Sequence, residues 1–149
     1  MNRNFANFFL VLIVTLLYGC AQTTEFSKTI WGSSTRALEK ARVNALVRIY
    51  DKPVARCYDE VIKAAEETKF KIFIDNKPKA TVVLMGIKGA VDTTEVGIFF
   101  SELSDGQTKV YISSLSSNAK RIVADKIFAH LDEVLGASSS QTVTVINEQ

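Results

Sequence analysis

The sequence is poor in the residues that most enzyme and metal sites use. Its 149 residues include 2 cysteines, 1 histidine, 1 tryptophan and 2 prolines. With His130 as the single histidine, a zinc site would depend on carboxylate ligands. No motif around a serine or Cys57 supports nucleophilic catalysis, and the glycine spacing from Gly86 to Gly97 matches no phosphate-binding fingerprint. We therefore expect no catalytic residues, no cofactor, no metal and no enzymatic activity.

Charge of one sign is also lacking. The chain carries 18 basic and 16 acidic side chains, for a net charge of +2. Such a balance creates no strong field for a polyanion, so we expect no nucleic acid partner. The length corresponds to a single domain with one hydrophobic core.

Long apolar runs are confined to the first 20 residues, which resemble a secretory signal peptide. Arg3 precedes an apolar stretch at 8–17 that is too short to span a bilayer comfortably. The following residues, Leu17-Tyr18-Gly19-Cys20, resemble the lipobox of bacterial lipoproteins. The resemblance implies cleavage after Gly19, a diacylglycerol on Cys20 and further acylation, for example by palmitate. Two or three acyl chains anchor a protein durably to a membrane.

The residues after Cys20 bear on where the anchored protein resides. Lipoproteins kept at the inner membrane of many Gram-negative bacteria carry Asp after the lipidated cysteine, whereas Ala21 and Gln22 stand here. By this resemblance we expect the periplasmic face of the outer membrane in preference to the inner membrane. Residues 20–32 form the lipidated N-terminus and a short polar tether, in which Trp31 either packs on the domain or dips into the membrane interface.

Lipidation of Cys20 would leave Cys57 without an intramolecular partner. Cys57 falls on the apolar stripe of a predicted helix, which indicates a buried structural thiol, although intermolecular pairing or a reactive thiol stays open. That helix is the strongest periodic signal in the chain, with Val54, Tyr58, Val61 and other apolar residues at helical spacing after Pro53. Asp51 is expected to cap it, and Glu60 and Glu67 are expected on its solvated face.

Residues 33–136 are expected to form the folded domain. A first helix begins near Ser33, and residues 46–50 form either its continuation or, as we favour, a strand. Four strand-like runs follow at 70–75, 80–87, 94–103 and 108–114, with a hairpin turn at Asp105-Gly106. A second amphipathic helix extends from Ser116 to Gly136. Residues 137–149 form a tail whose alternating part, 142–146, either frays or adds a strand to a sheet edge.

This order predicts an α+β fold: a two-layer sandwich with a four- to five-stranded, mostly antiparallel sheet and two amphipathic helices on one face. Alternation places Ile72 and Ile74 toward the helices, with the apolar residues of the other strands that share their face. It places Phe73, Phe99 and Tyr111 on the other face, which makes them candidate partner-binding residues. Alternatively, the first helix, Trp31 or a C-terminal strand covers these three rings as a minor second core.

Two further stretches, residues 34–39 (STRALE) and 95–100 (EVGIFF), resemble an uncharacterised family of small bacterial lipoproteins with one α/β domain. The resemblance supplies no activity. The main functional hypothesis is a non-catalytic, membrane-anchored envelope lipoprotein that binds another envelope protein near the outer membrane. The alternative is a carrier of a lipid or small ligand, with a cavity between helices and sheet.

Overall fold

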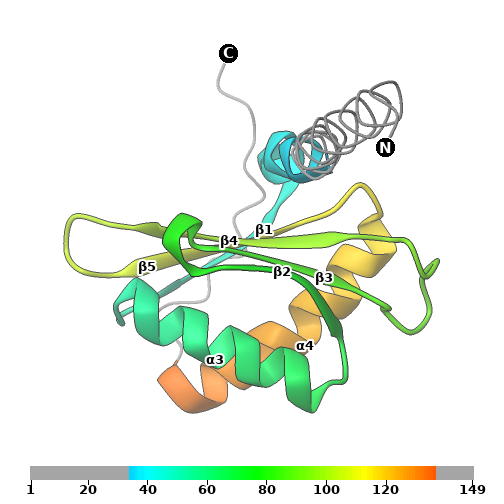
Figure 1. The fold of residues 1–149 in the computed structure, drawn as a ribbon. Coiled ribbons are helices and arrows are strands. Elements are labelled where there is room, and N and C mark those ends of the chain that lie inside the picture. The colour runs from blue at the N-terminus through cyan, green and yellow to red at the C-terminus, as the bar shows by residue number, and fades with distance from the viewer. Residues whose placement is uncertain (1–33, 137–149) are drawn as a thin grey trace, which may run out of the picture. The chain divides into compact units, whose positions relative to one another are not determined.

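The computed structural model describes residues 34–136, and the expected α+β sandwich is confirmed (Figure 1). One antiparallel sheet has the strand order β1-β5-β4-β3-β2, so β1 and β2 are its edges. The last four strands form the predicted meander. The strands are β1 (Leu46–Tyr50), β2 (Lys71–Asn76), β3 (Thr81–Met85), β4 (Val96–Glu102) and β5 (Thr108–Ser113), and the helices that cover one face are α3 (Val54–Glu67) and α4 (Ser117–Leu135).

The sequence that surrounds each of these helices explains where it begins and ends. Pro53 is the N-cap of α3, and no side chain caps that helix, so the expected capping role of Asp51 is wrong. At α4, the Ser116 side chain accepts a hydrogen bond from the Ala119 amide, at the position where the sequence predicted this helix to begin. Gly136 ends α4 with a positive φ of 79°. Residues 46–50 form a strand rather than a continuation of the first helix.

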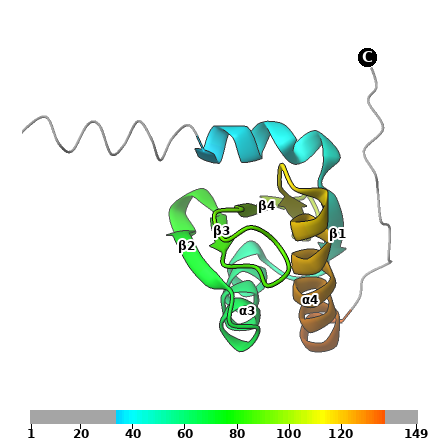
Figure 2. The same ribbon diagram turned by 90° about the vertical axis from the view of Figure 1, so that its right-hand side faces the viewer.

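The main core lies between the sheet and the pair α3 and α4, which lie side by side on the same face (Figure 2). Its centre is formed by fully buried side chains from both layers, including Val61, Ile98, Ile112, Ile127 and Leu131. Burial of such side chains is the main stabilising contribution in a domain of this size.

A smaller core lies on the opposite face of the sheet. Residues 34–40 are helical and lead into the short 3-10 helix η1 (Ala41–Asn44). Leu38 packs there with Val83 and Phe99, and its carbonyl oxygen accepts a hydrogen bond of 2.8 Å from the Ser113 hydroxyl. The first helix therefore covers part of the second face.

Strand β2 contains an irregularity that reverses its predicted alternation. Ile72 pairs with Leu84, and Ile74 pairs with Val83, so Phe73 is an extra residue in the ladder. Such a bulge turns every later side chain to the other face. Ile74 consequently joins the minor core on the second face, which corrects its predicted position against the helices. Asp75 turns the opposite way and accepts a hydrogen bond from the Tyr58 hydroxyl on α3.

Several expectations concern parts of the chain outside residues 34–136. These are the signal peptide at 1–19, the lipidated Cys20 with its tether at 20–32, and the tail at 137–149. Within the described range, no helix is long and apolar enough to cross a membrane.

Candidate functional site

The three aromatic residues proposed as a docking surface lie on the second face, but they do not form an open patch. Phe99 is only 3% exposed, because Leu38 and the Arg42 guanidinium cover it. Arg42 lies 4.2 Å from the centre of the Tyr111 ring, whereas Phe73 is half-buried beside the same cluster. The alternative of a minor second core covered by the first helix describes these rings better. Phe99 cannot be an exposed contact residue.

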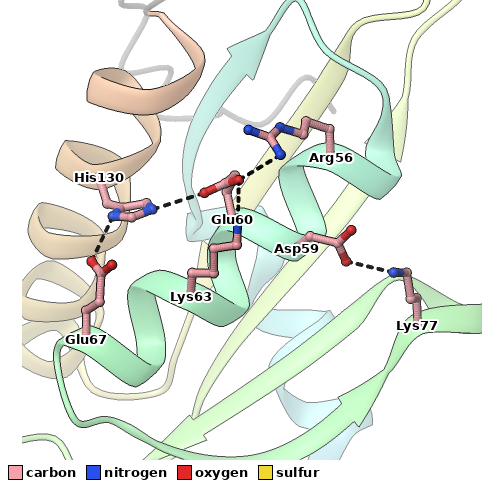
Figure 3. Close-up of polar contacts among 7 residues, drawn as sticks. All are labelled: Arg56, Asp59, Glu60, Lys63, Glu67, Lys77 and His130. Atoms are coloured by element: carbon pink, nitrogen blue, oxygen red, sulfur yellow. Dashed lines mark hydrogen bonds and ion pairs between the residues drawn. The ribbon is translucent and has the colours of Figure 1, made fainter.

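A second group of polar residues joins α3 to α4 (Figure 3). The Glu60 side chain is only 2% exposed, although the sequence predicted a solvated position. One of its oxygens lies 2.9 Å from Lys63 and 3.0 Å from Arg56, and the other lies 3.3 Å from Nε2 of His130. The other ring nitrogen of His130 lies 3.1 Å from Glu67. The imidazole thus bridges two carboxylates of α3.

This Glu60–His130 cluster stabilises the packing of the two helices and does not resemble a reaction centre. Lys63, with His130 and Arg56, holds the pKa of Glu60 below its ordinary value, although burial acts in the opposite direction. In residues 34–136, no group of three or more His, Cys, Asp or Glu side chains is arranged to hold a metal ion.

The other buried titratable groups are held by structural contacts. Burial raises the pKa of Tyr50 to about 12, and its hydroxyl donates a 3.0 Å hydrogen bond to Asp132 of α4. Burial also raises the pKa of Cys57, which is fully buried in the main core as the helical stripe predicted. A buried thiol with a raised pKa is a poor nucleophile.

A carrier of a lipid or small ligand would need a cavity between the helices and the sheet, where the main core lies. The side chains between helices and sheet are packed against each other, and Val61, Ile98 and Ile127 are 0% exposed. This interior is filled by the protein's own side chains, so it offers no support for a ligand cavity there.

The hollow surface of the domain lies elsewhere, along the edge strand β1. A groove of about 370 Å³ runs between β1 and α4, where Leu46, Val47, Ala124 and Phe128 provide apolar atoms. It continues into a wider, open depression of about 720 Å³ beside η1. The exposed apolar side chains Val43 and Leu115 line this depression, with 53% and 79% of their surface accessible. We call the two together the β1-edge groove.

Basic side chains outnumber acidic ones around the β1-edge groove. Lys40, Arg48, Lys120 and Arg121 line it, whereas Asp125 is the single acidic residue among the lining side chains. Arg48 forms an ion pair with Asp132 and lies over the Phe128 ring at 4.9 Å. Arg121 and Lys40 are exposed. Within residues 34–136 no strand pairs with the outer edge of β1, so this basic, partly apolar groove lies beside an open strand edge in the described part of the chain.

Sequence reasoning missed this groove because its residues are scattered along the chain. Lys40, Arg48 and Arg121 come from three separate elements, and they converge only because β1 pairs with β5 at the sheet edge. The one available signal was the apolar run at 46–50, which was recognised as a strand but not as an edge. Comparison of the chain with known protein families and with curated proteins finds no match.

Proposed function

We propose that this chain is a lipid-anchored envelope lipoprotein whose domain serves as a non-catalytic protein-interaction module near the outer membrane. Cys20 would hold the lipid, and the domain at 34–136 would bind an envelope protein. The observation that carries the interaction part is the β1-edge groove, which combines exposed apolar side chains, a basic rim and a strand edge that no other strand of residues 34–136 covers. Exposed apolar clusters of this kind commonly mark partner-binding sites.

The polar clusters favour this function over a catalytic one. Two buried groups join separate elements: Glu60 of α3 contacts His130 of α4, and Tyr50 of β1 donates a hydrogen bond to Asp132 of α4. The filled main core likewise favours an interaction module over the alternative, a lipid or small-ligand carrier. We do not place the partner site on the sheet face that carries Phe73, Phe99 and Tyr111, because Phe99 is covered there.

The anchor is tested by a Cys20→Ser variant expressed with its signal peptide. Loss of the lipid should move the protein from the membrane fraction to the soluble fraction, since a domain without acyl chains has no durable attachment. A Cys57→Ser variant serves as the matched control and should remain in the membrane fraction. Equal membrane retention of both variants, once the signal peptide has been removed, would contradict the anchor.

The interaction site is tested by photo-crosslinking in intact cells. A photoreactive phenylalanine at Leu115, which is 79% exposed and lines the groove, should give a discrete crosslinked product. The same amino acid at Val91, which is 71% exposed outside the lining of the groove, is the control. Identical product patterns at the two positions, or no product at either, would argue against the β1-edge groove as the partner site.

A further inference from the structure

We propose that the β1-edge groove binds an extended segment of another protein as an added β-strand, and that this segment alternates apolar and acidic side chains. This inference rests on the proposed function and names the chemistry of the partner. Three features of the described residues support it: the state of the sheet edge, the position of α4 and the charge of the rim.

The two edges of the sheet differ in how well they can accept another strand. Strand β2 carries a bulge at Phe73 and exposed charges at Lys71 and Asp75, which are features that discourage edge pairing. Strand β1 has a regular register of five residues with β5 and contains no bulge or proline. Within residues 34–136, no strand pairs with its outer edge. An edge of this kind is open for strand addition.

Helix α4 forms a wall along this edge. The Lys120 ammonium donates a hydrogen bond to the Asn44 carbonyl oxygen just before β1 begins, and Asp132 contacts Arg48 and Tyr50 toward the end of the strand. The helix therefore runs alongside β1 over its whole length. Because Arg121 and Asp125 line the groove together with β1 residues, a strand added there would have alternate side chains facing α4.

The charge of the rim determines which side chains the added strand should carry. Lys40, Lys120 and Arg121 line the groove against Asp125, the one acidic group among the lining residues, and the fourth basic group, Arg48, is already paired with Asp132. Carboxylates at alternate positions could pair with Arg121 and Lys120. The apolar side chains between them would point to the opposite face of the sheet, on the side of Val47, which pairs with Tyr111 there. Complementary charge of this kind raises the association rate and excludes basic segments.

Other occupants fit less well. A second copy of β1 would bring another Arg48 to an already basic rim. The alternating residues 142–146 of this chain, which lie outside the described range, contain no carboxylate. Both are outcomes that the experiment must separate from a foreign acidic strand.

The experiment measures binding of synthetic peptides to the full mature chain in detergent by fluorescence anisotropy. The first probe is a labelled peptide of about ten residues with alternating Val and Glu, a length that covers the edge strand with margin. The second probe replaces every Glu by Lys, and the third carries N-methyl groups on alternate backbone nitrogens. Arg121→Glu is the groove variant, and Lys71→Glu at the opposite sheet edge is the matched charge-reversal control.

We expect the Val-Glu peptide to bind at least about tenfold more tightly than the Val-Lys peptide, and the N-methylated peptide to lose at least about tenfold in affinity. Arg121→Glu should weaken binding at least about fivefold, whereas Lys71→Glu should change it less than about twofold. Equal affinities for the Glu and Lys peptides, no effect of N-methylation, or no binding at about 1 mM would overturn the proposal.

A photoreactive residue at position 121 without added peptide identifies the other occupants. A crosslink to residues 137–149 of the same chain, or to a second copy, would show that the edge is already occupied and would overturn the proposal. If the Val-Glu peptide does not bind but position 115 still gives a crosslinked product in cells, only the proposed acidic, extended partner segment is refuted. If neither peptide binding nor the crosslink from position 115 is observed, the proposed function is refuted as well.

Discussion

At the scale of single residues, Gly97 shows how closely the first helix approaches the sheet. A Cβ added at this position would lie 2.6 Å and 2.9 Å from atoms of the Phe99 ring and 3.3 Å from Cβ of Leu38. The backbone conformation is ordinary here, so the requirement for glycine is space. Gly97 therefore has a packing role in the minor core.

Gly97→Ala should therefore lower the free energy of unfolding by about 1–3 kcal/mol, the usual cost of overpacking a closed site. Urea unfolding followed by circular dichroism measures the effect. Ser101→Ala, on the same strand and the same face, is the control and should change stability by less than about 0.5 kcal/mol. An unchanged unfolding midpoint in Gly97→Ala would contradict the close packing of Leu38 and Phe99.

The carboxyl group of Glu60 should make the stability of the domain depend on pH. Its pKa is lowered in the folded state, so its contribution is fully present above the ordinary value of about 4.5 and is lost as the pH falls through the lower folded value. Glu60→Gln should reduce stability by about 1–3 kcal/mol near pH 7, because the neutral amide cannot form ion pairs with Lys63, Arg56 and His130.

The measurement compares unfolding free energies at about pH 7 and about pH 3.5. The wild type should lose more stability than Glu60→Gln over this range, since the variant lacks the titrating carboxyl. Glu66→Gln, at an exposed position on the same helix, should follow the wild type. Parallel losses in wild type and Glu60→Gln would show that the Glu60–His130 cluster does not stabilise the fold.

At the scale of elements, the first helix converts one face of the sheet from an exposed surface into a minor core. Leu38 is 2% exposed at the centre of this core. Leu38→Ala should cost about 2–4 kcal/mol, the range observed for truncation of buried leucines. Val43→Ala, at an exposed position in the adjacent η1, should cost less than about 0.5 kcal/mol. Similar small effects for both variants in urea unfolding would mean that this helix does not contribute to the folded domain.

Periodicity and turn residues were sufficient to predict the elements and the meander of the sheet. The helical spacing around Cys57 and the Asp105-Gly106 turn are local signals, and both predicted the structure correctly. The bulge at Phe73 could not be predicted, because strand pairing rather than local sequence determines it. Burial of Glu60 was missed for a similar reason: its environment depends on His130, which lies 70 residues away and reaches it only when α4 packs on α3.

The β1-edge groove depends on the same long-range organisation. Its floor and rim come from η1, β1 and α4, and its edge exists only because the topology places β1 beside β5. The sequence indicated a membrane-anchored interaction module, and its candidate surface was the aromatic face of the sheet. Phe99 is covered there, which is why we place the proposed partner site at the edge of the sheet instead.

At the scale of the whole molecule, the proposed anchor and the proposed docking site act together. The proposed tether at 20–32 would reach at most roughly 45 Å when fully extended. A domain held by such a tether remains near the membrane, so its partner should itself reside at the membrane or in the adjacent periplasm. The small net charge of the chain is consistent with a position set by the lipid instead of by a charged surface.

Intact-mass spectrometry of the protein purified from membranes tests the lipid anchor most directly. The proposal expects residues 1–19 to be absent and Cys20 to carry a diacylglycerol, with or without a further acyl chain on its amino group. The mass should therefore equal that of residues 20–149 plus these lipids, and Cys20→Ser should lack them. A mass equal to the unprocessed chain, or to residues 20–149 without lipid, would contradict the anchored state on which the proposed function depends.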